Sequence, residues 1–183
     1  MSIPNFITIG RILLVPFVVW AIGSGQMLIA FVLFGIAGIS DGVDGFLAKR
    51  FGMTSELGAF LDPLADKALL VSIYVALGIA DALPRWLVIL VVSRDILFIG
   101  GVMLAWFVDR PMTMRPHFVS KLNTAAQIVL AGLVLGLLGL QMQVDWLVDA
   151  LMALVGALTL LSAALYVAEW IRHMGLLDPG TQP

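Results

Sequence analysis

Cysteine is absent from this 183-residue chain, and histidine occurs only at His117 and His173. Without cysteine the protein has no disulfide framework, no thiolate nucleophile and no thiolate metal site. Two histidines so far apart in the sequence do not predict a histidine-based zinc centre. Any metal ion that this protein binds is therefore expected to be held by carboxylates.

Charged residues are also scarce, at 12% of the chain against 61% hydrophobic residues. A typical soluble domain carries roughly 25% charge, and a domain of this size has too little interior to hide so much apolar surface from water. The mean hydropathy of +1.07 therefore predicts a protein surrounded by membrane lipids. With a net charge of −2, no nucleic-acid partner is expected.

The first apolar run does not predict a cleavable signal peptide. Arg11 interrupts it, no small-residue cleavage site follows it, and apolar segments continue through the rest of the chain. An Arg- and Ser-rich organelle presequence is not indicated either. We therefore expect the N-terminal segment to belong to the membrane domain.

The sequence instead contains a series of long apolar segments. A membrane-spanning helix needs about 20 apolar residues, so the chain has room for about six spans with short connections. The predicted spans are 6–22, 27–49, 57–80, 86–107, 121–140 and 146–172. We predict an all-α integral membrane bundle, with a single transmembrane domain over residues 1–175 and a disordered tail at 176–183.

Basic residues gather at the span ends that share one side of the predicted bundle. These residues are Arg11, Lys49, Arg50, Lys67, Arg110, Arg115, Lys121 and Arg172. Positive charge favours the cytoplasmic side of a membrane. This bias predicts that both termini are cytoplasmic, and we expect a bacterial inner membrane as the location.

Four aspartates lie at the predicted cytoplasmic ends of the second and third spans. Asp41 and Asp44 are three residues apart, and Asp62 and Asp66 are four apart, so each pair shares one helix face. Oxygen ligands at this density favour Mg²⁺, Mn²⁺ or Ca²⁺ over zinc or copper. Two such ions can clamp a diphosphate. This predicts an active site at the cytoplasmic ends of these two helices.

Two other interpretations of the aspartates remain open at this point. Each aspartate can cap a helix or pair with a nearby basic residue, although four in register on two helices favour a shared site. A cation transporter would use carboxylates near the membrane midplane along a through-route. Their position at one membrane face favours chemistry at the surface.

This region resembles the signature of the CDP-alcohol phosphotransferases, integral membrane enzymes that transfer a phosphatidyl or phospho-alcohol group from a CDP-activated donor to an alcohol. The matching run is Asp41-x2-Asp44-Gly45-x2-Ala48-Lys49-x8-Gly58-x3-Asp62-x3-Asp66. Lys49 stands where the family usually has arginine. Lysine reaches a phosphate without a bidentate fork, and Arg50 can share that role.

The resemblance implies a role for each signature residue. Asp41, Asp44 and Asp62, with Asp66, bind two Mg²⁺ or Mn²⁺ ions, and Asp66 is the base that deprotonates the acceptor hydroxyl. The residues that line the nucleotide end of the donor site are Gly45, Ala48, Lys49 and Gly58. The family also implies a homodimer.

Other segments resemble two groups within the family, the phosphatidylglycerophosphate synthases and the CDP-alcohol class of cardiolipin synthases. Residues 3–11 match both groups, whereas Ser93-Arg94-Asp95 and residues 118–127 favour the second. The resemblance implies CDP-diacylglycerol as donor, phosphatidylglycerol as acceptor, and cardiolipin and CMP as products. Glycerol 3-phosphate as acceptor, giving phosphatidylglycerophosphate, is the alternative.

Six residues outside or beside the signature are further candidates for substrate contacts: Asn5, Arg11, Arg94, Arg110, Arg115 and Lys121. Asn5 and Arg11 either contact donor phosphates or anchor the first helix. Arg94 is costly within an apolar span unless paired, so it either pairs with an aspartate such as Asp95 or anchors a phosphate. The basic strip after the fourth span attracts anionic lipids by default, and acceptor binding is its other possible use.

The fifth predicted span carries features of helix packing. Gly132, Gly136 and Gly139 predict the close approach of a neighbouring helix. Asn123 and Gln127 share one helix face, where they either help to select the acceptor or form hydrogen bonds between helices.

Overall fold

The computed structural model describes residues 3–51, 56–107, 118–142 and 144–173, with side chains over 8–43, 65–98, 100, 118–142 and 144–171. Within these ranges the chain forms α-helices and no strand. The six helices are α1 Ile3–Gly23, α2 Met27–Phe51, α3 Glu56–Ile79, α4 Arg85–Phe107, α5 Phe118–Gly139 and α6 Asp145–His173. Each predicted span corresponds to one helix, and the all-α class is confirmed. The predicted tail at 176–183 lies outside the described residues.

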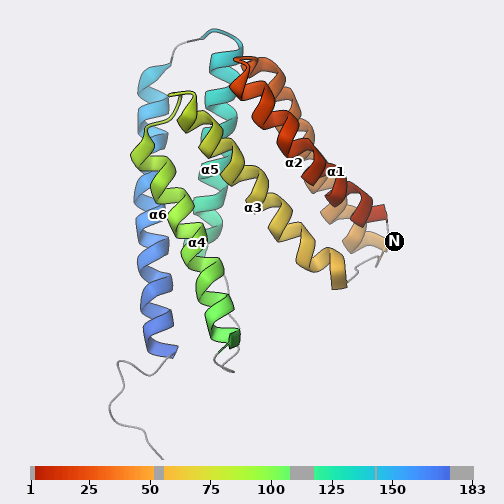
Figure 1. Ribbon diagram of the computed structural model, residues 1–183, viewed down its shortest axis with the longest axis vertical. Helices are drawn as coiled ribbons and strands as arrows, with labels where there is room; N and C mark the ends of the chain where they lie inside the picture. The colour runs from red at the N-terminus through yellow and green to blue at the C-terminus, as the bar shows by residue number, and fades with distance from the viewer. Residues whose placement is uncertain (1–2, 52–55, 108–117, 143, 174–183) are drawn as a thin grey trace, which may run out of the picture.

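The three short connections between helices share one hydrogen-bond pattern. Gly25, Asp81 and Gln141 have φ angles of 73°, 54° and 55°. The amide after each of them donates to a carbonyl five residues earlier, at 2.8 Å, 2.9 Å and 2.8 Å respectively. A left-handed residue with this bond ends a helix and reverses the chain. The three connections lie toward the upper end of the molecule in Figure 1.

The helices alternate in direction, so the start of α3 and the end of α2 lie at the same end of the molecule (Figure 1). α1 packs against α2 and α3, and α6 packs against α4 and α5. Contacts of α5 with α2, and of α3 with α4 and α5, join these two groups. α3 therefore lies between the N-terminal and the C-terminal halves of the bundle.

Glycines on α5 allow α2 to approach closely. A Cβ at Gly139 would lie 2.7 Å from the Leu28 Cα, and one at Gly136 would lie 3.2 Å from the Phe31 ring. Larger residues at these positions would push the two helices apart. The close approach that these glycines predict is confirmed.

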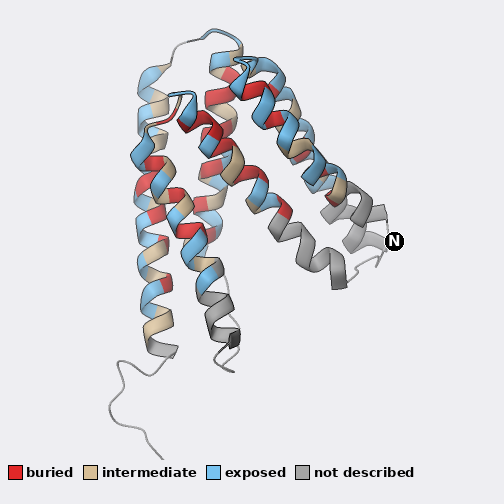
Figure 2. Cartoon of the chain, viewed as in Figure 1, coloured by how far each residue is buried: buried red, intermediate tan, exposed pale blue. Residues whose placement is uncertain are grey.

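Apolar residues fill the interior and also cover much of the outside (Figure 2). Ile73, Leu77 and Leu130 are fully or almost fully buried, whereas Trp20 and Ile79 are 59% and 80% exposed. Apolar exposure on this scale marks a surface that contacts lipid or another protein. Among the described residues, Phe118–Gly139 and Asp145–Ile171 are long and apolar enough to cross a membrane, and Thr8–Gly23 and Met27–Val43 are shorter apolar stretches.

Buried polar groups connect α5 to its neighbours. The Thr159 hydroxyl of α6 donates to the Asn123 side-chain oxygen at 3.0 Å, so Asn123 forms a hydrogen bond between helices, one of its two expected uses. Gln127 differs from Asn123, because its backbone carbonyl accepts a bond from the Tyr74 hydroxyl at 3.1 Å. The Gln127 side-chain amide has no hydrogen-bond partner among the described residues. Its link to α3 therefore runs through the main chain.

Candidate functional site

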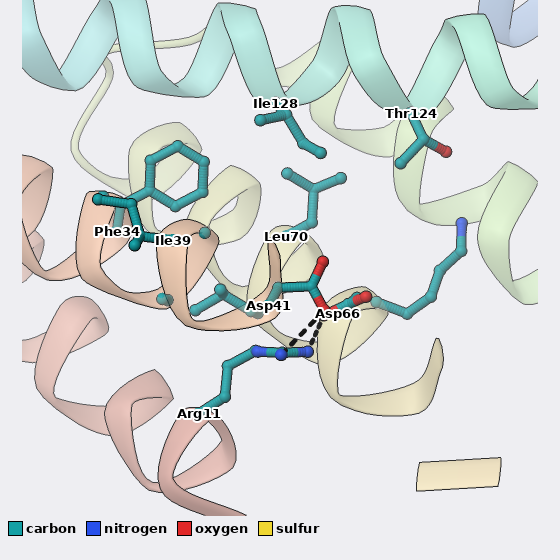
Figure 3. Close-up of a pocket in the computed structure, with 13 residues that line it drawn as sticks. Arg11, Phe34, Ile39, Asp41, Asp66, Leu70, Thr124 and Ile128 are labelled. Atoms are coloured by element: carbon teal, nitrogen blue, oxygen red, sulfur yellow. Dashed lines mark hydrogen bonds and ion pairs between the residues drawn. The ribbon is translucent and has the colours of Figure 1, made fainter. Parts of the chain in front are cut away.

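Arg11 of α1 joins two of the predicted site aspartates. Its guanidinium forms an ion pair with Asp41 of α2 at 2.9 Å and donates a hydrogen bond to Asp66 of α3. Figure 3 shows the two carboxylates turned toward the same guanidinium. We call these three residues the Arg11 cluster. Carboxylates that are 25 residues apart in sequence are thus brought together by a cation from a third helix.

Exposure differs sharply within the Arg11 cluster. The Arg11 side chain is 1% exposed, whereas those of Asp41 and Asp66 are 50% and 47% exposed. A buried guanidinium is stable in an apolar bundle only when it is paired. The two carboxylates keep access to solvent. A further cation can therefore reach them from the exposed side of the cluster.

A cavity of about 610 Å³ opens beside the Arg11 cluster. Its polar end is formed by Arg11, Asp41, Asp66 and Lys67, and most of the remaining wall is apolar. That wall includes Phe34, Gly35, Ile39, Leu69, Leu70 and Ile128, several of which are drawn in Figure 3. We call this the first cavity. A space with one charged end and an apolar body suits an amphiphilic molecule.

Asp44 and Asp62 lie on the same helices as Asp41 and Asp66, one turn nearer to the connection between α2 and α3. Their side chains lie outside the described part of the structure. Among the described residues, no group of three or more acidic, histidine or cysteine side chains gathers as a metal centre would. The shared site of four carboxylates thus remains a prediction. The described structure brings two of the four, Asp41 and Asp66, to the same guanidinium.

A second polar cluster surrounds Arg94, which is 2% exposed within α4. Its Nη1 donates to Asp95 at 2.6 Å, and its Nη2 donates to Ser162 of α6 at 2.9 Å. Nη2 also donates to Ser120 of α5, and the guanidinium lies 5.5 Å from the centre of the Tyr166 ring. We call these residues, with Lys67, the Arg94 cluster. Pairing with Asp95 is one of the two alternatives that the sequence left open for Arg94, and the structure contains this pair.

Lys67 connects the Arg94 cluster to α3. Its ammonium donates to the same Asp95 oxygen at 2.6 Å. The Asp95 side chain is 4% exposed, and that of Lys67 is 24% exposed. Asp95 therefore forms ion pairs with two cations, Arg94 in the interior of the bundle and the more exposed Lys67.

A second cavity of about 440 Å³ lies against the Arg94 cluster. Its wall contains the three cations Lys67, Arg94 and Lys121 and the hydroxyls of Ser120 and Tyr166. No acidic residue of the described chain lines this cavity. The wall carries net positive charge and is suited to an anion.

The structure describes the side chains of only some predicted contact residues. Arg11, Arg94 and Lys121 each line a cavity. The following lie outside the described side chains: Asn5, Gly45, Ala48, Lys49, Gly58, Arg110 and Arg115. Sequence reasoning missed the positions of Lys67 and Tyr166 in the second cavity. The available signal was that each is a polar residue within an apolar helix, where an interior position is favoured.

Comparison with known proteins identifies a family. The CDP-alcohol phosphatidyltransferase domain matches residues 1–167 of this chain. A probable CMP-forming cardiolipin synthase of Drosophila melanogaster is 35% identical over 152 residues, which are 74% of this chain and 47% of the fly protein. The human CMP-forming cardiolipin synthase is 36% identical over 145 residues, which are 70% of this chain and 48% of the human protein.

A third relative matches over a greater length. A probable phosphatidylglycerophosphate synthase of Mycobacterium tuberculosis is 33% identical over 180 residues, which are 95% of this chain and 84% of the mycobacterial protein. In contrast, the chain spans about half the length of the fly and human relatives. The relatives therefore agree on the type of reaction and differ in the acceptor that their names imply.

Proposed function

We propose a function from one premise: this chain belongs to the CDP-alcohol phosphatidyltransferase family. The protein transfers the phosphatidyl group of CDP-diacylglycerol to the hydroxyl of phosphatidylglycerol, which gives cardiolipin and CMP. The fly and human relatives, which are named as CMP-forming cardiolipin synthases, support this acceptor.

The observation that carries this proposal is the position of Asp41 and Asp66 at the polar end of the first cavity. CDP-diacylglycerol has a charged diphosphate attached to two long apolar chains. The polar end of the cavity would receive the diphosphate, and the apolar wall would contact the lipid chains.

Asp41, Asp44, Asp62 and Asp66 are the residues proposed to hold two Mg²⁺ or Mn²⁺ ions. Carboxylate oxygens are the ligands that such ions prefer. The pairing of Arg11 with Asp41 and Asp66 supports the fit, because these carboxylates already stabilise one cation between them. Bound ions would neutralise the diphosphate and stabilise charge on the phosphoryl group.

Asp66 is the proposed general base. Arg11 holds its carboxylate at the first cavity. Asp66 takes the proton of the acceptor hydroxyl while the hydroxyl oxygen bonds to the phosphatidyl phosphorus. The bond from that phosphorus to the CMP oxygen breaks, and CMP leaves with the electron pair.

The nucleotide end of the donor site is assigned to the signature residues Gly45, Ala48, Lys49 and Gly58. Small residues there let the nucleotide approach the helix backbone. Asn5 and Arg11 are proposed to lie near the donor phosphates. The acceptor is proposed to bind in the second cavity, whose wall contains Arg94 and Lys121. Arg110 and Arg115 precede Lys121 in the chain and are further candidates for acceptor contacts.

A second candidate function is phosphatidylglycerophosphate synthesis, with glycerol 3-phosphate as the acceptor. The mycobacterial relative favours it, because that match covers most of both chains. The positive wall of the second cavity also suits a free phosphate group. The two functions share the donor and the chemistry and differ only in the acceptor.

We further propose that all six helices cross a bacterial inner membrane, as a homodimer, with the Arg11 cluster at the cytoplasmic face. The alternation of the helices supports this arrangement, since it brings the basic ends of the predicted spans to one side. A lipid acceptor would then enter from the bilayer, and a soluble acceptor would enter from the cytoplasm.

The proposed function is tested with purified protein, CDP-diacylglycerol and Mg²⁺ or Mn²⁺, supplying phosphatidylglycerol and glycerol 3-phosphate in separate reactions. We expect CMP release and cardiolipin with phosphatidylglycerol, and no CMP release after chelation of the metal. Release with glycerol 3-phosphate alone would assign the second candidate. No release with either alcohol would contradict a phosphatidyltransferase function.

A further inference from the structure

Lys67 lies where the two cavities meet. It lines both of them, together with Thr124 and Ile128 of α5. Among the described residues, it is the charged side chain common to the two walls. The residue before it, Asp66, lines the first cavity. Because Lys67 lines both cavities and Asp66 lines the first, the Lys67 ammonium connects the second cavity to the cavity that contains the proposed base.

Lys67 differs from Arg94 in its freedom to bind a ligand. The Arg94 nitrogens all have partners, in Asp95, Ser120 and Ser162. The Lys67 ammonium has three donors, and Asp95 accepts one of them at 2.6 Å. Lys67 is also the more exposed of the two cations.

Asp95 lets Lys67 move without leaving an unpaired buried charge. Removing the single partner of a buried charge is strongly unfavourable. Asp95, however, also accepts from Arg94 Nη1 at 2.6 Å, and Arg94 is anchored by α5 and α6. When Lys67 turns toward a ligand, the Asp95 carboxylate stays neutralised by Arg94.

We propose that Lys67 is a specificity-determining residue that binds the phosphate of a glycerol phosphate acceptor. This inference rests on the phosphatidyltransferase function proposed above. Its ammonium leaves Asp95, binds the acceptor phosphate in the second cavity, and so holds the acceptor hydroxyl toward Asp66. The shared chemistry is a phosphate on glycerol, carried either by phosphatidylglycerol or by free glycerol 3-phosphate.

The kinetic test compares Lys67→Gln, Lys67→Arg and the control Arg85→Gln. Arg85, the first residue of α4, is an exposed cation that forms an ion pair with Asp81 in the connection between α3 and α4. A charged hydrogen bond lost in Lys67→Gln should raise the KM for the acceptor at least about tenfold. The kcat should fall by a smaller factor, and donor binding should persist. Lys67→Arg should restore most of the acceptor affinity, and Arg85→Gln should match the wild type.

A binding test without donor separates this inference from the proposed function. Glycerol 3-phosphate and phosphatidylglycerol in detergent micelles are titrated separately by calorimetry into the wild type and Lys67→Gln. We expect one of the two probes to bind the wild type and to bind the glutamine variant at least about tenfold more weakly. The probe that responds identifies the soluble or the lipid source of the phosphate.

The outcomes are distinguishable. Lys67-dependent binding without CMP release in any reaction would support Lys67 and contradict the proposed function. CMP release by the wild type with an unchanged acceptor KM in Lys67→Gln would overturn the role of Lys67. Equal loss of donor and acceptor binding in Lys67→Gln, or no binding of either probe by the wild type, would also overturn it.

Discussion

Asp66 and Lys67 are adjacent in α3, yet they belong to different polar clusters. Asp66 pairs with Arg11 of α1, and Lys67 pairs with Asp95 of α4 at 2.6 Å. Successive residues on a helix point about 100° apart, so one turn of α3 reaches both halves of the bundle. The two cavities thus share a rigid element, and a shift of α3 would move the proposed base and Lys67 together.

Asp66→Asn should abolish turnover and retain donor binding. Asparagine has a similar shape but takes no proton, and a general base contributes about 10²–10⁴-fold to a rate. The measurement is CMP release together with binding of CDP-diacylglycerol. Asp81→Asn, at an exposed position beyond the other end of α3, is the control and should leave both unchanged. Full activity of Asp66→Asn would remove Asp66 as the base.

Arg11→Met should make the protein more dependent on divalent metal for its stability. Without the guanidinium, Asp41 and Asp66 repel each other, and the loss of charged contacts should lower the unfolding free energy by about 1–3 kcal/mol. The melting temperature in detergent should therefore rise more on adding saturating Mg²⁺ than it does for the wild type. Arg11→Lys, which keeps the charge without the planar fork, should give an intermediate shift. Equal shifts in all three proteins would contradict the prediction.

Arg94→Met should destabilise the fold far more than Arg85→Met. Removing Arg94 breaks its pair with buried Asp95 and also its hydrogen bonds to Ser120 of α5 and Ser162 of α6. Breaking a buried charge pair typically costs about 3–5 kcal/mol. The Arg85–Asp81 pair is exposed and spans 3.8 Å, and surface pairs contribute about 0–1 kcal/mol. Thermal unfolding of both variants in the same detergent provides the comparison. Similar melting temperatures would mean that Asp95 is adequately neutralised by Lys67 alone.

Gly139→Ala should destabilise the contact between α2 and α5. The added Cβ would meet the Leu28 backbone at 2.7–2.8 Å, so one helix has to shift. Overpacking of this kind costs about 1–3 kcal/mol. Gly100→Ala is the matched control, because no atom of the described residues outside its own helix lies within 4 Å of the new Cβ. An unchanged melting temperature for Gly139→Ala would show that α2 and α5 separate readily.

The helices and their order were predictable because their signals are local. An apolar run of sufficient length is a helix in lipid whatever it packs against, since its backbone groups must be satisfied internally. Local chemistry also accounts for two of the helix ends, because Ser24-Gly25 follows α1 and Pro84 precedes α4, and these residue types interrupt helices. Helical spacing also indicated that Asp41 and Asp66 mark site-facing surfaces, which their shared contact with Arg11 supports.

The partners of the buried cations were decided only by the tertiary structure. Spacing along a helix shows which residues share a face, but not which neighbouring helix that face meets. Arg11 was expected to contact donor phosphates or to anchor α1, and in the bundle it joins Asp41 to Asp66. The charge of Lys67 within an apolar helix favoured an interior position, but its place between two cavities depends on how α4 and α5 pack on α3. The spacing of the aspartates can thus be read from the sequence, whereas the pairing of Arg11 and Lys67 with aspartates of other helices is decided by how the helices pack.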